Sequence, residues 1–299
     1  MLTRRAGLAV MAGLIGLSGC STTPAGSTGA AKSPTPGSST PTPRTTAPSP
    51  SPTGKPTDKP SGMPRACTVP GTYLTDVRMG EHNGHDRVVF EFSGGRPAVT
   101  ADRVPTVYAD PKGTPVALAG QSNLRVVFRG ASGVCGQPLH RTWTGPSVLT
   151  PYYPELLVVC AAGDFEGYLS FGIGLAARGS CHVSTLASPD RVVIDFSHVT
   201  LAKFPGIWDI TSWPQYWARQ YSWRNGHQPW LASPLMVVRA WASSRWHTTP
   251  VIHEVDSSTF RVTEPSGKLD TLRGVRPVGV PGPWVITQIT YGTSRPAAR

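Results

Sequence analysis

The sequence predicts a mainly β protein, with a β-sandwich over residues 67–198 and a small α+β domain over residues 199–299. Three observations lead to this fold class. Short runs before residue 199 alternate apolar and polar positions, as residues 87–92 do, which is typical of half-buried strands. Eight of the nine tryptophans follow residue 204, where apolar positions recur at helical spacing. Residues 20–66 consist mostly of Pro, Gly, Ser, Thr and Ala and predict a disordered tether.

Residues 1–19 are typical of a signal peptide. Arg4 and Arg5 precede an apolar run at residues 6–17, which is too short to cross a hydrocarbon core of about 30 Å. The run ends in Leu17-Ser18-Gly19-Cys20, which resembles the bacterial lipobox. The resemblance implies cleavage before Cys20, lipidation of its thiol, and a protein anchored at the extracytoplasmic face of the cell membrane. The alternative is an ordinary secretory signal with a coincidental cysteine, and both the Sec and Tat export routes stay open.

The tether prediction rests on what these residues can bury. They offer almost no apolar side chain, so burial cannot offset the conformational entropy that ordering would cost. Their prolines favour an extended chain, which would hold the folded part away from the membrane.

Charge and cysteine content narrow the class of partner. The net charge is +11, but seven basic residues and one acidic residue lie in residues 1–66, which leaves +5 for residues 67–299. This modest value disfavours a nucleic-acid-binding protein. In an oxidising compartment we expect Cys67, Cys135, Cys160 and Cys181 to form two disulfides, with the pairing open. Their spacing matches no metal-binding motif, and we expect neither a metal nor another cofactor.

One strand pattern occurs twice. Residues 86–93, Asp-Arg-Val-Val-Phe-Glu-Phe-Ser, return as residues 190–197 with six of eight positions identical. The repeat predicts two equivalent strands of a pseudo-symmetric sandwich, each with an acid–Arg turn and an apolar inner face. Further strands are expected at residues 73–79, 104–109, 124–129, 155–161, 165–175 and 180–186.

Three segments of this half carry a resemblance to a known family. Residues 77–92, residues 164–175 and residues 190–196 are similar to the AMIN-like domain of actinobacterial lipoproteins, and an excess of arginine over lysine agrees with such a source. The resemblance implies a small β-sandwich. The related AMIN domain of cell-wall amidases and secretins implies a non-catalytic module that recognises peptidoglycan. Residues 131–154, with Cys135 and Trp143, and the set of four cysteines depart from the family.

Two polar pairs in this domain are candidate sites. Asp164 and Glu166 lie two apart in an expected hairpin, where they could accept hydrogen bonds from sugar hydroxyls or act as an acid/base pair. Asp164 is also a good turn residue after Gly163, which is the structural alternative. His82 and His85 could share a metal, but no third ligand stands nearby and we interpret them as exposed loop residues.

The C-terminal half predicts two helices and a small antiparallel sheet. Trp213, Trp217 and Tyr221 recur at helical spacing and predict a buried stripe on a helix that ends at Asn225-Gly226. A second helix is expected from Ser233 to about Trp246, followed by strands at residues 251–255, 259–263, 271–275 and 284–290. Together they predict a helical hairpin packed on the sheet.

Tryptophans outside that stripe are candidates for a binding surface. Trp223, Trp230 and Trp246 could stack on sugar rings or contact a protein, although clustered tryptophans at helical spacing also build cores.

The sequence carries no motif of a hydrolase, a P-loop or a dinucleotide site. The leading interpretation is a membrane-anchored, non-catalytic envelope lipoprotein whose first domain binds cell-wall polymer (peptidoglycan) or an envelope partner. The alternative is an adaptor that binds another exported protein through its Trp-rich C-terminal domain. A wall-polymer hydrolase ranks third.

Overall fold

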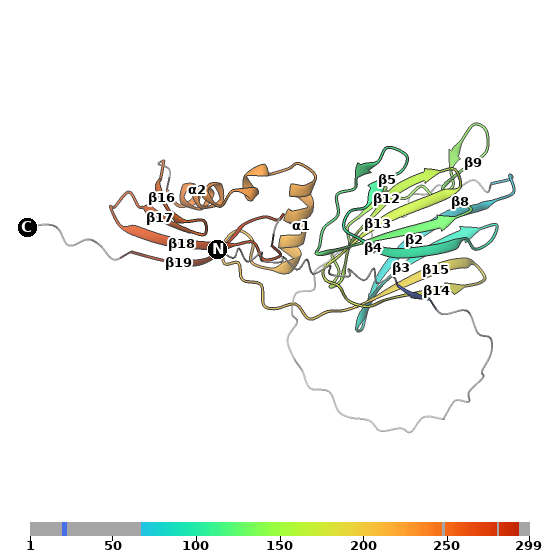
Figure 1. Ribbon diagram of the computed structural model, residues 1–299, viewed down its shortest axis with the longest axis horizontal. Helices are drawn as coiled ribbons and strands as arrows, with labels where there is room; N and C mark the ends of the chain where they lie inside the picture. The colour runs from blue at the N-terminus through green and yellow to red at the C-terminus, as the bar shows by residue number, and fades with distance from the viewer. Residues whose placement is uncertain (1–19, 23–66, 247–248, 280, 293–299) are drawn as a thin grey trace, which may run out of the picture.

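The computed structural model describes residues 20–22, 67–246, 249–279 and 281–292, so the expected signal peptide and nearly all of the tether lie outside the described residues. Figure 1 shows a β-sandwich at one end of the long axis and a smaller α+β unit at the other. The predicted fold class, mainly β with two helices before a small antiparallel sheet, is confirmed.

Two sheets form the sandwich. In spatial order, the first contains β1 (Ser21–Thr22), β14 (Cys181–Leu186), β15 (Asp190–Ser197), β3 (His85–Ser93), β2 (Thr72–His82) and β8 (Ala131–Ser132). The second contains β11 (Val148–Leu149), β12 (Leu156–Phe165), β13 (Tyr168–Leu175), β7 (Ser122–Arg129) and β4 (Ala98–Val104). Neighbouring strands are antiparallel, except that β1 and β8 join their sheet in parallel. Two short hairpins, β5 (Tyr108–Ala109) with β6 (Thr114–Pro115) and β9 (Val134–Cys135) with β10 (His140–Arg141), extend from the loops.

The core between the sheets is aromatic. Phe90 and Phe92 of the first sheet meet Phe128 and Phe171 of the second. The ring centroid of Phe90 lies 4.9 Å from those of Phe128 and Phe171, and the centroid of Phe92 lies 5.0 Å from that of Phe128. All four side chains are at most 3% exposed. Because alternate positions on each strand contribute to this core, the alternation read from the sequence follows directly from burial.

The two copies of the repeated pattern are neighbours in one sheet. β3 and β15 pair antiparallel, with Val89 opposite Val193 at the centre and Arg87 opposite Asp195 towards one end. The copies are therefore related by a local two-fold axis. They differ at their first residue, because Asp86 is fully buried whereas Asp190 is partly exposed. The expected acid–Arg turn is wrong for both copies, because Asp86 lies inside β3 and Asp190 is the first residue of β15.

Two strand predictions also need correction. A β-bulge between Leu74 and Asp76 breaks the regular alternation expected for residues 73–79, so Leu74 and Val77 face the core although they lie three residues apart. The strand expected at residues 104–109 is split, because β4 ends at Val104 and β5 begins only at Tyr108.

The C-terminal unit contains α1 (Trp213–Arg224), the 3₁₀ helix η1 (Pro229–Ala232) and α2 (Pro234–Arg245). A sheet follows, with β16 (Val251–Asp256), β17 (Thr259–Thr263), β18 (Leu269–Val275) and β19 (Val285–Thr290) in sequence order. The Ser233 hydroxyl caps α2 by accepting a hydrogen bond from the Met236 N–H at 3.4 Å. α2 packs on β17 and β19 through residues such as Val238 and Ala242.

The two halves share a hydrophobic cluster, and this differs from the expected helical hairpin on one sheet. Of the predicted stripe on α1, Trp217 is buried and Trp213 and Tyr221 are partly buried. The stripe packs against the outer face of the sandwich, where Trp217 meets Val158 and Cys160 in one cluster. Inside this contact, the backbone N–H of Gly120 donates to Oε1 of Gln220 at 2.7 Å. One face of the second sheet is therefore covered by the C-terminal half.

Candidate functional site

A cavity of about 330 Å³ lies between the two sheets of the sandwich, lined by residues of β2, β12 and β13 and of the segment after β8. Its lining is mostly apolar, with Arg141 and Asp164 as the charged members. The lining residues are Leu74, Gly133, Val134, Arg141, Trp143, Ala161, Ala162, Gly163, Asp164, Leu169 and Phe171. Figure 1 places β8 and β9 at the end of the sandwich away from α1, so the C-terminal half leaves this end open.

The segment after β8 builds one wall of the cavity. Trp143 packs edge-on against Phe171, with ring centroids 6.0 Å apart, and it is only 8% exposed. The neighbouring Thr142 fixes this position, because its hydroxyl donates to the Leu74 carbonyl at 2.8 Å and its N–H donates to the Gly133 carbonyl at 2.9 Å. Trp143 is thus held by β2 and by the bend after β8, which are distant in sequence.

Of the two charged side chains at the cavity, Asp164 is hydrogen-bonded within the protein and Arg141 is not. Oδ2 of Asp164 accepts hydrogen bonds from the Gly133 N–H at 2.7 Å and from the Ser132 hydroxyl at 3.0 Å. Arg141 is exposed, and its guanidinium makes no hydrogen bond or ion pair with any described residue. Asp164 therefore holds the loop in place, whereas Arg141 is free to meet a ligand.

Glu166 does not pair with Asp164 as the sequence suggested. It lies in the two-residue turn between β12 and β13 with φ 50°, followed by Gly167 with φ 76°. This left-handed turn ends the strand alternation, so the two carboxylates do not share a strand face. Phe165 and Tyr168 flank the turn and are about half exposed.

The candidate tryptophans of the C-terminal half come together in its own core. Trp223, Trp230 and Trp246 are partly buried and all pack against the cluster around α2 and β17. Trp246 contacts Trp241 edge-to-face at 5.5 Å, and the Arg245 guanidinium lies over both rings. In the structure these side chains are core elements with a solvent-facing edge and not a flat exposed platform.

The cysteines pair differently from the expectation. Cys67 is bonded to Cys135, with Cα atoms 6.0 Å apart, and Cys181 is bonded to Cys20, with Cα atoms 4.9 Å apart. Cys160 is a buried free thiol in the cluster beneath α1. The expectation that Cys160 is bridged is therefore corrected, because its side chain faces α1 on the outer side of the sheet while Cys181 faces the core.

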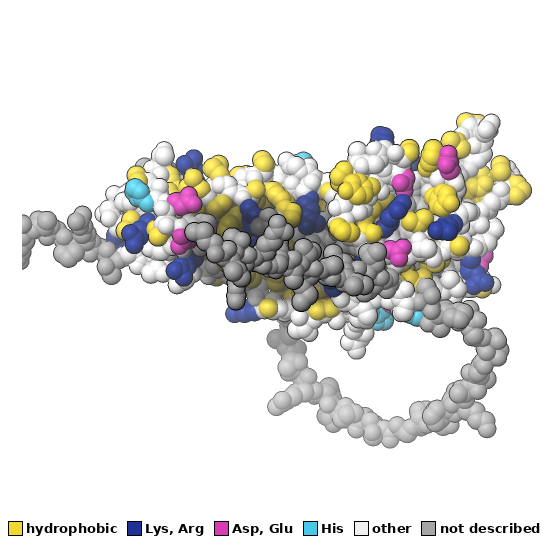
Figure 2. Space-filling model, viewed as in Figure 1, with side chains coloured by type: hydrophobic (Ala, Val, Ile, Leu, Met, Phe, Trp, Pro, Cys, Tyr) yellow, Lys and Arg dark blue, Asp and Glu magenta, His cyan; other side chains and the backbone are white. Residues whose placement is uncertain are grey.

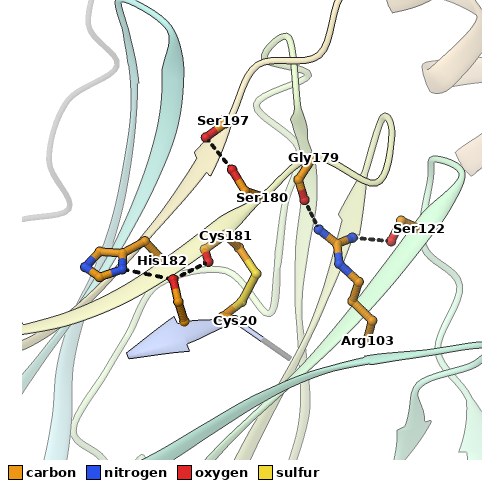
Figure 3. Close-up of a disulfide and its surroundings, with 9 residues drawn as sticks. Cys20, Arg103, Ser122, Gly179, Ser180, Cys181, His182 and Ser197 are labelled. Carbon is orange, nitrogen blue, oxygen red and sulfur yellow. Dashed lines mark hydrogen bonds between the residues drawn. A yellow bond between two sulfur atoms is a disulfide. The ribbon is translucent and has the colours of Figure 1, made fainter. Parts of the chain in front are cut away.

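Figure 3 shows how residue 20 reaches Cys181 at the edge of the first sheet. The N–H of Cys20 donates to the Ala101 carbonyl at 3.1 Å, and β1 pairs in parallel with β14. The Ser21 hydroxyl donates to the Cys181 carbonyl at 3.3 Å and lies 3.2 Å from Nδ1 of His182. The same sulfur atom of Cys20 cannot carry both this disulfide and a lipid thioether, so the two states exclude each other.

A buried polar cluster lies where β3, β12 and the loop before β14 meet. Oδ2 of Asp86 accepts from the backbone N–H groups of Glu155 and Leu156 at 2.7 and 2.8 Å, and Oδ1 lies 2.8 Å from Nε2 of His198. Burial raises the pKa of Glu155, which backbone donors and the charge of Arg103 only partly oppose. Asp86 and Glu155 are at most 1% exposed, so a substrate has no access to them and their role is structural.

Metal binding and membrane crossing find no support in the described residues. His82 and His85 stack face to face at the β2–β3 turn with ring centroids 4.9 Å apart, and no group of three or more His, Cys, Asp or Glu side chains in the described part could hold a metal. None of the described helices is long and apolar enough to cross a bilayer. Figure 2 shows basic and acidic side chains interspersed with hydrophobic ones over the visible face.

Comparison with known families relates the sandwich to one of them. Residues 72–198 match the model of the AMIN-like domain. This segment is an AMIN-like domain. The match begins at the first residue of β2 and ends one residue after β15, so it spans the cavity and both sheets. No curated protein and no solved structure matches the chain.

Proposed function

We propose that this protein is a membrane-anchored, non-catalytic envelope lipoprotein whose AMIN-like domain binds peptidoglycan. The observation that carries the proposal is the match of residues 72–198 to the AMIN-like domain, because such domains are typically binding modules without catalytic activity. The positions of the two candidate carboxylates agree with a binding role. Asp164 is engaged by the loop and Glu166 lies in a turn, so the pair is not arranged as a general acid and base.

The membrane anchor rests on the lipobox resemblance around Cys20. A lipid anchor confines the module to the membrane surface, which raises its effective concentration near the wall and makes weak binding sufficient. In this lipidated form Cys181 has lost its partner and carries a free thiol. Thiol counting under denaturing conditions tests this. We expect the unlipidated oxidised chain to show one free thiol, that of Cys160, and the lipidated chain to show two.

Sedimentation with insoluble peptidoglycan tests the binding function. The protein is the soluble chain of residues 20–299 with Cys20→Ser and Cys181→Ser, which cannot be lipidated and leaves neither cysteine unpaired. This chain has a net charge of +9, of which +5 lies in residues 67–299, so attraction to a polyanion should be screened by salt. For specific binding we expect co-sedimentation that persists when salt is raised to about 0.5 M. Loss of the protein from the pellet at high salt would indicate non-specific attraction to a polyanion, and no sedimentation at either salt would refute wall binding.

A second candidate function, an adaptor for another exported protein, has its own support. β16 is an edge strand of the C-terminal sheet, and Val251 and Val255 on it are more than half exposed. An exposed apolar edge strand is a surface on which a partner can add a strand. Failure of the sedimentation experiment, together with binding of an envelope protein that Val251→Ser abolishes, would favour this candidate.

A further inference from the structure

We propose that the cavity beside Trp143 is the ligand site of the AMIN-like domain and that it holds one N-acylated amino sugar bearing a carboxylate. This rests on the proposed function, since it names the part of the wall polymer that the domain recognises: muramic acid units whose lactyl carboxylate is free because the stem peptide has been removed. The argument uses the size of the cavity, its lining, its one free charge and its position in the fold.

The size and lining suit one acylated sugar. At about 330 Å³ the cavity is at the small end of ligand pockets, which is enough for one ring with its substituents. Leu74, Leu169 and Phe171 give it an apolar floor, on which the methyl group of an acyl substituent is favoured over water. Trp143, which packs edge-on against Phe171, supplies an aromatic wall that can meet the apolar face of a sugar.

The charges at the cavity favour an anionic ligand. Of the nearby carboxylates, Asp110 is paired, with Oδ2 3.1 Å from the guanidinium of Arg125, and Asp164 is held in the loop by the Gly133 N–H and the Ser132 hydroxyl. The Arg141 guanidinium lines the mouth and has no partner among the described residues. A planar guanidinium with free donors matches a carboxylate in geometry as well as in charge.

The position of the cavity leaves it open to a large polymer. α1 covers the outer face of the second sheet, and none of the described residues that line the cavity belongs to the C-terminal half. The disulfide between Cys67 and Cys135 fixes the β9–β10 hairpin, whose residues Val134 and Arg141 form one side of the mouth. The site is thus preformed on a rigid support, which lowers the entropic cost of binding a weak ligand.

Two sugars that differ by a single group test the proposal. N-acetylmuramic acid carries a lactyl carboxylate that N-acetylglucosamine lacks. The soluble chain of residues 20–299 with Cys20→Ser and Cys181→Ser is titrated with each sugar while the indole N–H signal of Trp143 is followed by NMR. We expect both sugars to shift this signal and N-acetylmuramic acid to bind about tenfold more tightly, the value of one charge-assisted contact at an exposed site.

Variants separate the charge from the cavity. Arg141→Gln should remove the tenfold preference and leave the affinity for N-acetylglucosamine unchanged. Arg129→Gln is the matched control, because Arg129 is an exposed arginine outside the cavity and should keep the preference. Ala161→Leu places a larger side chain at the exposed edge of the cavity and should abolish the shift with both sugars.

Each outcome decides between the two proposals. If the protein sediments with peptidoglycan but neither sugar shifts the Trp143 signal, the cavity is not the site and the proposed function stands. If both sugars bind with equal affinity, or an anionic dipeptide of alanine and glutamate binds more tightly than either, the ligand class is overturned. If N-acetylmuramic acid binds as expected but peptidoglycan is not sedimented, the cavity assignment holds and wall binding is refuted.

Discussion

Replacing Asp86 by alanine should destabilise the AMIN-like domain far more than the same change at Asp190, although both open the same repeated pattern. Asp86 is fully buried, and its carboxylate accepts hydrogen bonds from two backbone N–H groups at 2.7 and 2.8 Å. Alanine leaves both donors buried without a partner, at a cost of about 1–3 kcal/mol each, and it also removes the contact with His198. We therefore expect a loss of about 4 kcal/mol in the free energy of unfolding.

Asp190 is the matched control. It is about one-third exposed and pairs with Arg96 at 3.3 Å, an interaction at the surface that contributes less than about 1 kcal/mol. Asp86→Asn is a milder variant, because its amide oxygen can still accept from one or both N–H groups, and it should cost about 1–2 kcal/mol.

Urea unfolding followed by tryptophan fluorescence and far-UV circular dichroism measures these differences. Midpoints are compared for the soluble chain and its three variants at pH 7. Equal losses for Asp86→Ala and Asp190→Ala would refute the reasoning, because they would mean that burial and hydrogen bonding of the first carboxylate contribute nothing beyond a surface ion pair.

Three further predictions use other parts of the structure. Burial raises the pKa of Asp195, but the hydrogen bonds and charge of Arg87 lower it overall. The pair therefore stabilises the fold fully above the ordinary aspartate pKa of about 3.9, and this stabilisation is lost as the pH falls through the lower pKa of the folded state. Arg87→Gln should therefore cost about 1 kcal/mol at pH 7 and nothing near pH 2 in urea unfolding, and a loss independent of pH would contradict this. Burial raises the pKa of Glu155, so the wild type should lose stability as the pH rises above about 4.3. The melting temperature of Glu155→Gln should therefore rise relative to that of the wild type between pH 4 and pH 8. A difference in melting temperature that stays constant over this range would disprove the prediction. Burial also raises the pKa of the Cys160 thiol to about 11, so this thiol should react slowly with a thiol reagent in the native protein. Trp217→Ala should uncover the thiol and accelerate the reaction. An unchanged reaction rate would argue against the contact between the halves.

The sequence predicted most of the strands and both helices because burial imposes a period that composition reveals. β7, β14 and β15 lie where alternation placed them, and α2 begins at the expected Ser233-Pro234. β2 differs because a bulge inverts the alternation after Leu74, and nothing in the local sequence marks the extra residue.

Contacts between distant residues could not be predicted in the same way. The stripe of α1 signals a buried face, but the same apolar residues fit the sheet of their own domain and the sandwich equally well. The pairing of Cys20 with Cys181 joins residues 161 positions apart, and no spacing rule selects it over the other pairs.

The candidate site was predicted only in part. Asp164 stands out in the sequence and lines the cavity, whereas Arg141 and Leu74 also line it but belong to no motif that would mark them. Trp143 lies in a segment that departs from the family, so the family resemblance does not mark it as part of a site. The cavity arises because β2, β12 and the segment after β8 converge, and this convergence is a property of the tertiary fold.

The central claim, that the AMIN-like domain binds peptidoglycan through the cavity beside Trp143, is tested most directly by sedimentation of cavity variants. The soluble chain is compared with Ala161→Leu, which fills the mouth, and with Val251→Ser, which changes an exposed residue of the C-terminal sheet. We predict that the unaltered chain and Val251→Ser sediment with peptidoglycan at both low and high salt, whereas Ala161→Leu stays in the supernatant with an unchanged unfolding midpoint. Equal sedimentation of all three proteins, or of none, would contradict the account.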